Sequence, residues 1–361
     1  MPVLIVKQVI QETEDARTYV VEDTSGEKII YKAGQFITFT INRNGRELRR
    51  SYSLNSSPGF DEHVCFTVKL VPNGEISRYL FNSVTEGSTF VAQAPSGRFV
   101  FDAVPDPLVP EKKRDIYLVA AGSGVTPVFS LLKQMVGLDN ERLHIKLVLQ
   151  NRSASSAIFH KEFVSLADRF GARMDFYDFL SAPVLLHTST DGHLQHQAGT
   201  IAGRINNEIF EELINNSLRF DRADALFYIC GPVSFMRMAE FTVRQMGFGA
   251  GQVKKEIFEV PVISHVGFTV DDTVRSVAVR VDGEERVIGV QFPQSILDAA
   301  LANGIDIPYS CKAGICGSCA VRCRSGKVRM RSNDVLTDAE VGGGLILTCT
   351  GYAESDLVLE V

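Results

Sequence analysis

The chain has 361 residues, of which 45% are hydrophobic and 22% charged, and its formal net charge is −6. This composition indicates a globular protein of two or three domains. The acidic balance lacks the basic footprint of a nucleic-acid-binding protein, so we expect no nucleic-acid partner.

Two features of the sequence predict a cytoplasmic protein without a membrane span. Lys7 interrupts the first apolar stretch, and no small-residue cleavage site follows it, so a signal peptide is not expected. Residues 118–136 are the most apolar stretch, but Gly, Ser, Pro and Lys interrupt it, which favours a strand, a turn and a helix. In a reducing cytoplasm, clustered cysteines more often bind metal or do redox chemistry than form disulfides.

The first predicted domain covers residues 1–110. Short β-branched and aromatic runs, the last of them at 98–102, alternate with turn residues. This pattern predicts an antiparallel β-barrel or sandwich, with one helix over residues 74–84.

Two motifs in this domain suit a ligand that has a phosphate and an aromatic ring. In the R-x-Y-S pattern, Arg50 can bind phosphate as a fork, Tyr52 offers a flat face, and Ser53 can reach a ring nitrogen. Gly74 and Ser77 lie at the start of the predicted helix, where free N–H groups and the helix dipole favour phosphate. Alone, the R-x-Y-S pattern also fits an ordinary surface strand.

A proline-rich segment at 103–114 predicts a linker, and the second predicted domain covers residues 111–260. Apolar strands alternate with helices there, which indicates a parallel, doubly wound sheet. The first strand runs into a Gly-rich turn at 122–124, which is typical of a pyrophosphate site. A helix is expected to follow from Thr126, with Pro127 where the dinucleotide fingerprint would have its third glycine.

Two other strand ends in this domain carry candidate ligand-binding residues. Cys230 is followed by Gly231 and Pro232 at a position where ligands sit in α/β sheets, although a plain buried cysteine is the alternative. Arg152 follows another strand and suits the 2′-phosphate of NADPH. Three histidines at 187, 193 and 196 fit a solvated loop better than a metal site, because no carboxylate or cysteine completes a ligand set.

The third predicted domain, residues 261–361, is a small α+β unit with a cysteine-rich loop. Its cysteines have the C-x4-C-x2-C spacing of plant-type 2Fe–2S ferredoxins, with a fourth after 29 residues: Cys311, Cys316, Cys319 and Cys349. Gly314 and Gly317 let the backbone wrap closely, so that its N–H groups can point at the sulfurs. Structural zinc and a disulfide framework are the alternatives, and Cys65 and Cys323 fit small core residues.

Together these motifs resemble a known family over essentially the whole chain. The stretch PYSCKAGICGSCAVRCRSGKV with LTCTGY closely resembles a plant-type ferredoxin domain. Five further motifs resemble those of the ferredoxin–NADP reductase superfamily: R-x-Y-S, G-x-x-S, the G-x-G-x-x-P turn, CGP and KKEIF. The chain is thus similar to its single-chain reductases, with a flavin β-barrel, a nicotinamide lobe and a β-grasp ferredoxin domain in that order. Among their subfamilies it looks most like the phenylacetyl-CoA epoxidase reductase subunits.

The resemblance implies cofactors and roles for individual residues. It implies FAD rather than FMN, a 2Fe–2S cluster held by the four cysteines, and NADPH or NADH. Arg152 favours NADPH, although Ala182 stands where NADP-selective relatives often carry Arg. Ser53, Cys230 and Glu256 are expected at the hydride-transfer site, with Glu256 as a plain surface residue the alternative. The expected cofactor-binding residues are Arg50, Ser51, Tyr52, Ser53, Val68, Lys69, Gly74, Ile76, Ser77, Phe258, Gly122, Gly124, Thr126, Pro127, Arg152, Gly231, Pro232 and Met236.

The resemblance also implies a function. We expect an oxidoreductase that passes electrons from NAD(P)H through flavin and cluster to an oxygenase component, with a di-iron enzyme that epoxidises or hydroxylates a ring as the favoured acceptor. The alternatives are a reductase for a Rieske dioxygenase or hybrid-cluster protein, and a sensor subunit that binds flavin and cluster without turnover. The acceptor protein is expected to dock near Lys312 and Ala313.

Overall fold

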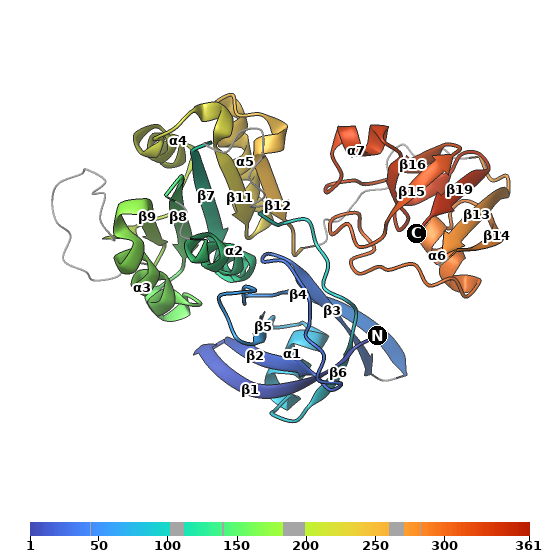
Figure 1. Cartoon of the computed structure of the whole chain (residues 1–361), viewed down its shortest axis with the longest axis horizontal. Helices are drawn as coiled ribbons and strands as arrows, with labels where there is room; N and C mark the ends of the chain where they lie inside the picture. The colour runs from blue at the N-terminus through green and yellow to red at the C-terminus, as the bar shows by residue number, and fades with distance from the viewer. Residues whose placement is uncertain (44, 102–111, 139–140, 183–198, 260–270, 282) are drawn as a thin grey trace. The chain divides into compact units, whose positions relative to one another are not determined.

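The computed structural model describes the chain except for residues 44, 102–111, 139–140, 183–198, 260–270 and 282. It divides into two compact units, Met1–Phe258 and Glu259–Val361 (Figure 1). Most of the predicted linker and the three loop histidines lie outside the described residues. No helix in the described part of the chain has both the length and the apolar character needed to cross a bilayer.

The first unit begins with a six-stranded antiparallel sheet in the order β4-β3-β6-β1-β2-β5. Its elements are β1 (Val3–Thr13), β2 (Ala16–Asp23), β3 (Phe36–Arg43), β4 (Arg46–Ser53), β5 (Val64–Lys69), α1 (Glu75–Ser83) and β6 (Thr89–Ala92). Alternate residues of β3, namely Ile37, Phe39 and Ile41, face one core, and Ile76 and Leu80 of α1 pack against it. The predicted antiparallel β domain is confirmed.

The predicted strand at 98–102 is wrong over its described residues, 98–101, which pack against the second domain instead of joining the sheet. Phe99 and Phe101 are buried in the core below the parallel sheet. The Val100 carbonyl accepts hydrogen bonds from the Tyr228 hydroxyl at 3.2 Å and the Lys254 ammonium at 2.7 Å. Side chains of the neighbouring domain therefore satisfy a backbone group that a strand would have paired with another strand.

The second half of this unit is a six-stranded parallel sheet in the order β10-β9-β8-β7-β11-β12. Its strands are β7 (Arg114–Ala121), β8 (Leu143–Asn151), β9 (Met174–Leu180), β10 (Gly199–Ala202), β11 (Leu226–Cys230) and β12 (Val253–Glu256). Its α-helices are α2 (Val125–Gly137), α3 (His160–Phe170), α4 (Asn207–Ser217) and α5 (Val233–Gln245).

Helices cover both faces of the parallel sheet (Figure 1). Ile116 and Leu118 of β7 pack with residues of α2 and α3, whereas Tyr117 and Val119 pack with residues of α4 and α5. Such two-sided burial is why these strands are almost uniformly apolar. The predicted doubly wound sheet is confirmed.

The strand order reverses between β7 and β11, because β8, β9 and β10 lie on one side of β7 and β11 on the other. Open α/β sheets bind ligands at the carboxyl ends of strands at such a point. The helix after the glycine turn begins at Val125, one residue earlier than predicted. Thr126 does not cap it, since its hydroxyl donates back to the Ser123 carbonyl at 3.0 Å.

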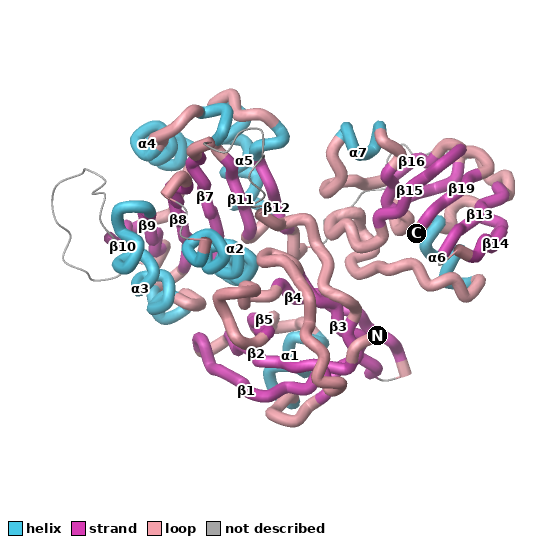
Figure 2. The backbone as a smooth tube through the Cα atoms, in the orientation of Figure 1, coloured by secondary structure: helices cyan, strands magenta, loops and turns pink. Residues whose placement is uncertain are grey.

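The second unit has a five-stranded sheet in the order β14-β13-β19-β15-β17 and a two-stranded sheet of β16 and β18 (Figure 2). Its strands are β13 (Arg275–Val281), β14 (Glu284–Val290), β15 (Ala320–Ser325), β16 (Val328–Met330), β17 (Leu345–Leu347), β18 (Gly351–Ala353) and β19 (Leu357–Glu360). Its helices are α6 (Ile296–Ala302) and α7 (Asp338–Gly342). The buried face of α6 packs against the sheet in one core, to which Cys319 and Cys349 contribute.

Candidate redox site

The three residues predicted at the hydride-transfer site come together in the first unit. Cys230 pairs with Glu256 across β11 and β12, and with Ala120 of β7 on its other side. Ser53 ends β4 of the antiparallel sheet, and its hydroxyl donates to Glu256 Oε2 at 3.0 Å. Side chains that are 203 residues apart in the sequence thus meet at the carboxyl end of the parallel sheet.

The environment of Glu256 favours the protonated carboxylic acid. The residue as a whole is partly exposed, but its carboxylate lies deep in the protein. Burial raises the pKa of Glu256 to about 8, and the Ser53 hydroxyl opposes this only in part. Within the described residues, no lysine or arginine forms an ion pair with it. A carboxyl group with such a pKa can hold or release a proton near neutral pH.

Cys230 is fully buried. Burial, and then the nearby Glu256 carboxylate, raise the pKa of its thiol well above the ordinary value. The thiol is therefore neutral at physiological pH and is not a nucleophilic thiolate. A Cβ at Gly124 would lie 2.3 Å from the Cys230 carbonyl oxygen, so only glycine lets the turn approach this strand end.

A pocket of about 620 Å³ opens beside these strand ends. Gly122 has a φ of +56°, and a Cβ there would meet no atom within 4 Å, so its backbone faces open space. Of the predicted residues, Lys69, Gly122, Arg152 and Pro232 line the pocket. The remaining lining residues are Asp15, Ala121, Gln150, Asn151, Ser156, Ser181, Arg204, Ile205, Ser234, Phe235 and Met238.

Sequence reasoning missed most of this lining. Arg204 lies just after β10, and no sequence motif indicated that it would line a pocket. On α5 the predicted residue was Met236, but the structure buries Met236 in the core. Ser234 and Met238 of the same helix line the pocket instead. Helical periodicity would have assigned Met236 to the buried face of α5 and Ser234 and Met238 to the pocket face, but only if the buried face had been known beforehand.

The R-x-Y-S strand places its side chains in different surroundings. Arg50 is exposed, and its guanidinium donates to the Arg49 carbonyl at 2.7 Å. The ring of Tyr52 lies 5.7 Å from that of Phe66, and burial raises the pKa of its hydroxyl. The hydroxyls of Ser51 and Thr38 form a hydrogen bond at 2.8 Å.

The predicted phosphate site at the start of α1 is tightly built. The Ser77 hydroxyl accepts from the Val71 amide at 3.1 Å, and a Cβ at Gly74 would lie 2.4 Å from the Ser77 oxygen. This glycine therefore lets the chain turn closely over the helix start. Val68 and Ile76 are buried in the core, whereas Phe258 is exposed.

In the second unit, the four predicted cysteines converge. The Cys311 thiol hydrogen-bonds with those of Cys316 and Cys349, and Cys349 also with Cys319. Hydrogen bonds from Cys316, then Cys349 and the Ala313 amide, lower the pKa of Cys311. The pKa of Cys319 is lowered as well, whereas the same hydrogen bonds raise those of Cys316 and Cys349, so the thiolate, the form that binds iron, is favoured at two of the four positions.

The loop backbone keeps these sulfurs close. Gly314 and Gly317 both have a φ of +77°, and a Cβ at Gly314 would lie 2.6 Å from the Ser332 carbonyl oxygen. All seven cysteines are free, so no disulfide competes for the four. In the described part of the chain, no three His, Cys, Asp or Glu side chains are grouped around a single ion position. Three thiols on one loop and a fourth at a distant strand end suit the two irons of a plant-type 2Fe–2S cluster.

Comparison with known proteins agrees with this division of the chain. Residues 3–101 match the oxidoreductase FAD-binding domain, residues 118–240 the oxidoreductase NAD-binding domain, and residues 279–354 the 2Fe-2S iron-sulfur cluster binding domain. The class of protein that the fold and these domains define is a flavin iron–sulfur oxidoreductase of the ferredoxin reductase type.

Relatives align with this chain over nearly their whole length. The chain is 31% identical to a component of the 1,2-phenylacetyl-CoA epoxidase of Escherichia coli, over 99% of this chain and 96% of the relative. It is 33% identical to the ferredoxin reductase component of 3-ketosteroid-9-alpha-monooxygenase of Mycolicibacterium smegmatis, over 98% and 95%. The solved phthalate dioxygenase reductase has the same fold, with a TM-score of 0.57 and 23% identity, over 99% of this chain and 97% of the solved one.

The chain belongs to the family of single-chain reductases with FAD-binding, NAD-binding and 2Fe–2S domains. It is an oxidoreductase that transfers electrons from NAD(P)H through FAD and a 2Fe–2S cluster. The predicted family, fold class, cofactors and electron-transfer function are confirmed at this level.

Proposed function

We propose that this chain is the reductase component of a multicomponent oxygenase, and that its acceptor is a di-iron enzyme that epoxidises or hydroxylates a ring. The observation that carries this proposal is the full-length similarity to the phenylacetyl-CoA epoxidase component of Escherichia coli. The similarity to steroid monooxygenase reductases is equally long, so a steroid-oxidising enzyme is the second candidate acceptor.

The residues of this chain would divide the work as follows. When bound, the nicotinamide supplies a hydride, the flavin separates its two electrons, and the cluster transfers them singly. Ser53 donates to Oε2 of Glu256 and so positions this carboxyl, which holds its proton on the other oxygen, Oε1, near neutral pH. Cys230 supplies a neutral, buried thiol at the same strand end and so excludes water. In the other unit, Cys311, Cys316, Cys319 and Cys349 would hold the cluster.

This division of work is tested by replacing one cluster cysteine. In Cys316→Ser, we expect NADPH to reduce the flavin at the wild-type rate, because Cys316 belongs to the other unit. Reduction of cytochrome c and of the purified oxygenase component should fall to background. Anaerobic rapid mixing with absorbance detection measures both steps. Undiminished reduction of the protein acceptors would contradict a path through the cluster.

We further propose that the chain prefers NADPH to NADH. Arg152 and Arg204, both exposed, line the pocket together with Ser156 and Ser181, and two guanidinium groups suit a doubly charged phosphate. We expect Arg204→Ala to raise KM for NADPH by about tenfold or more, the usual size of a lost charge-assisted contact. KM for NADH should stay unchanged. An equal rise for both nucleotides would contradict a 2′-phosphate site.

A further inference from the structure

Helix α2 buries polar side chains against the antiparallel β domain. Ser130 is fully buried and Lys133 is 4% exposed, and they lie three residues apart on the same helical face. The hydrogen-bond and ion-pair partners of the two side chains belong to the antiparallel β domain. Polar groups in such an interface are costly to bury unless they are paired, so their pairing is informative.

Ser130 joins two segments of the β domain. Its hydroxyl donates to the Ser56 carbonyl at 2.5 Å and accepts from the Gly34 amide at 3.1 Å. Gly34 has a φ of +85°, and a Cβ there would lie 1.9 Å from the Phe99 carbonyl oxygen. The same Cβ would lie 3.1 Å from Leu131 Cδ2 of α2, so glycine at position 34 lets this loop lie close to the helix.

Lys133 makes the second connection. Its ammonium lies 2.6 Å from Asp61 Oδ2 and 4.3 Å from the centroid of the Phe129 ring. The same Asp61 oxygen accepts from the Ser57 amide at 2.6 Å. Lys133 thus holds the turn 57–61 through a partly buried ion pair, in which the lysine is enclosed and the Asp61 side chain is 27% exposed, so water screens it less than a surface pair.

Both connections act on chain segments that lead directly to the redox site. Ser56 is three residues beyond Ser53, and the segment between them is buried. At its other end, α2 begins directly after the glycine turn 122–124 that faces the nucleotide pocket. One helix therefore connects the β strand that ends at Ser53 with the turn beside the nucleotide pocket (Figure 1).

We propose that Ser130 and Lys133, which we call the interdomain clamp, are positioning residues for hydride transfer. The clamp fixes the Ser53 strand end relative to the glycine turn, and so fixes the spacing between the two rings that exchange the hydride. Misplacement by about 1 Å can slow a reaction by about a hundredfold, so small slippage at the clamp matters. The inference rests on the electron-transfer function already established and not on the identity of the acceptor.

Lys133→Met in the FAD- and cluster-loaded protein is the test. We expect the rate of flavin reduction at saturating NADPH to fall between about tenfold and a hundredfold. The dissociation constant of NADP⁺ should not change, because Lys133 does not line the nucleotide pocket. The absorbance change of the oxidised flavin on NADP⁺ binding should differ from wild type, since it reports how the rings lie together. Lys133→Arg, which keeps the charge, should restore most of the rate.

Lys146→Met is the matched control. Lys146 also forms an ion pair with an aspartate, Asp115, but within the parallel-sheet domain. We expect this variant to lose thermal stability and to keep the wild-type reduction rate and NADP⁺ difference spectrum.

Two outcomes would overturn the proposal: wild-type flavin reduction in Lys133→Met, or an equal slowing in Lys146→Met. If Lys133→Met does not fold, Asp61→Asn and Ser130→Ala test the same clamp by the same two readouts, and wild-type behaviour of both would overturn it.

Discussion

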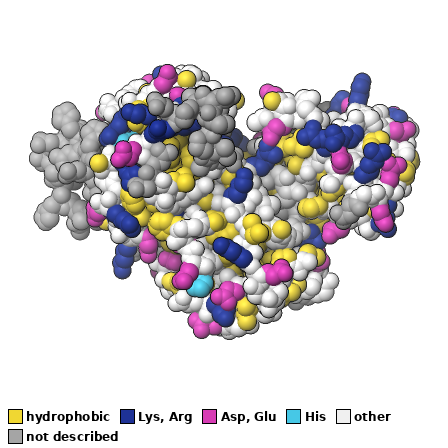
Figure 3. All heavy atoms as spheres, viewed as in Figure 1, with side chains coloured by type: hydrophobic (Ala, Val, Ile, Leu, Met, Phe, Trp, Pro, Cys, Tyr) yellow, Lys and Arg dark blue, Asp and Glu magenta, His cyan; other side chains and the backbone are white. Residues whose placement is uncertain are grey.

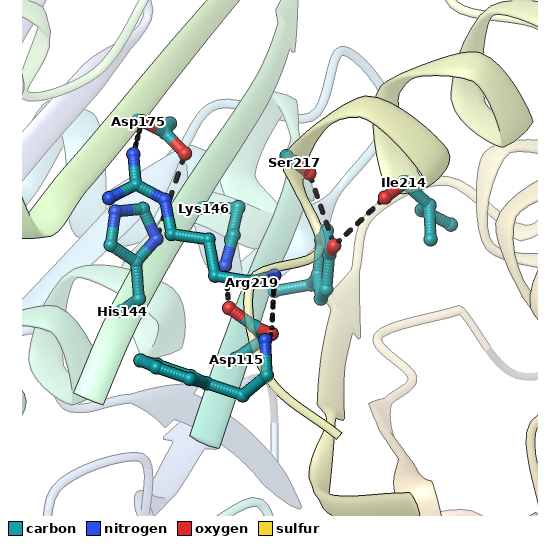
Figure 4. A network of polar contacts seen from close by, with 9 residues as sticks. Asp115, His144, Lys146, Asp175, Ile214, Ser217 and Arg219 are labelled. Carbon is teal, nitrogen blue, oxygen red and sulfur yellow. Dashed lines mark hydrogen bonds and ion pairs between the residues drawn. The ribbon is translucent and has the colours of Figure 1, made fainter. Parts of the chain in front are cut away.

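Carboxylates are buried at both ends of the parallel sheet, but their hydrogen-bond and ion-pair partners differ. At the amino end, Asp115 and Lys146 are fully buried and form an ion pair (Figure 4). The second Asp115 oxygen accepts from the backbone amides of Arg219 at 3.0 Å and Phe220 at 2.8 Å. At the carboxyl end, by contrast, Glu256 has a single hydroxyl partner, from Ser53, and its pKa is raised to about 8.

The neighbours of the amino-end pair complete its neutralisation. The Arg219 guanidinium donates to Asp175 at 3.2 Å. Burial, then Lys146 and Arg219, lower the pKa of His144 to about 3, so this imidazole is neutral. Each of the two aspartates there therefore has a cationic side chain beside it.

Both carboxylates are buried, so burial does not distinguish the structural carboxylate from the functional one. Their hydrogen-bond and ion-pair partners do. A carboxylate matched by a cation and two amides stays ionised and holds elements together. A carboxylate given only a hydroxyl retains its proton to higher pH and can exchange it. The amino end thus fixes the chain between α4 and β11, whereas the carboxyl end keeps a proton available. Elsewhere, acidic and basic side chains are mixed over the visible surface (Figure 3).

The largest expected effect of a single change is at the amino end. Lys146→Met removes one member of a fully buried ion pair, so we expect the free energy of unfolding to fall by about 3 kcal/mol, the lower end of the usual range. The two amide donors to Asp115 keep the loss at that lower end. Denaturant unfolding followed by circular dichroism measures it.

Asp115→Leu sharpens this prediction. This variant leaves the buried Lys146 ammonium without a counter-charge and two buried amides without an acceptor. Its free energy of unfolding should therefore fall by more than that of Lys146→Met. Equal stability of wild type and both variants would show that the pair contributes nothing.

The sequence predicted the functional end of the sheet and not the structural end. Cys230 could be placed at a strand end by the C-G-P motif, and Glu256 and Ser53 by their own short motifs. Asp115, Lys146 and Asp175 carry no motif. They lie in apolar strands about thirty residues apart, and only the register of β7, β8 and β9 brings them together.

The same limit applies to contacts between domains. Ser130 and Lys133 lie in the helix that the sequence predicted after the glycine turn. Nothing local indicates that Ser56 and Asp61 will receive them, because that depends on how two separately folded sheets pack. The strand predicted at 98–102 was wrong for the same reason. Its alternating apolar residues, Phe99 and Phe101, are buried against the neighbouring domain and not in a sheet.

At the carboxyl end, Glu256→Gln is expected to change how the free energy of unfolding depends on pH. The native protein keeps the Glu256 proton up to about pH 8, whereas the unfolded chain loses it near pH 4.5. Between these values the native state binds more protons, so the free energy of unfolding falls as pH rises. In flavin-free protein, the variant should match wild type near pH 5 and exceed its stability at pH 9.

Ser53→Ala tests the cause of this behaviour. The Ser53 hydroxyl lowers the pKa of Glu256, so its removal should extend the fall in stability to still higher pH. Thermal unfolding at a series of pH values measures all three proteins. If the stability of Glu256→Gln has the same pH dependence as that of wild type, the native protein does not hold a proton on Glu256. The proposed protonation of this carboxyl group would then be wrong.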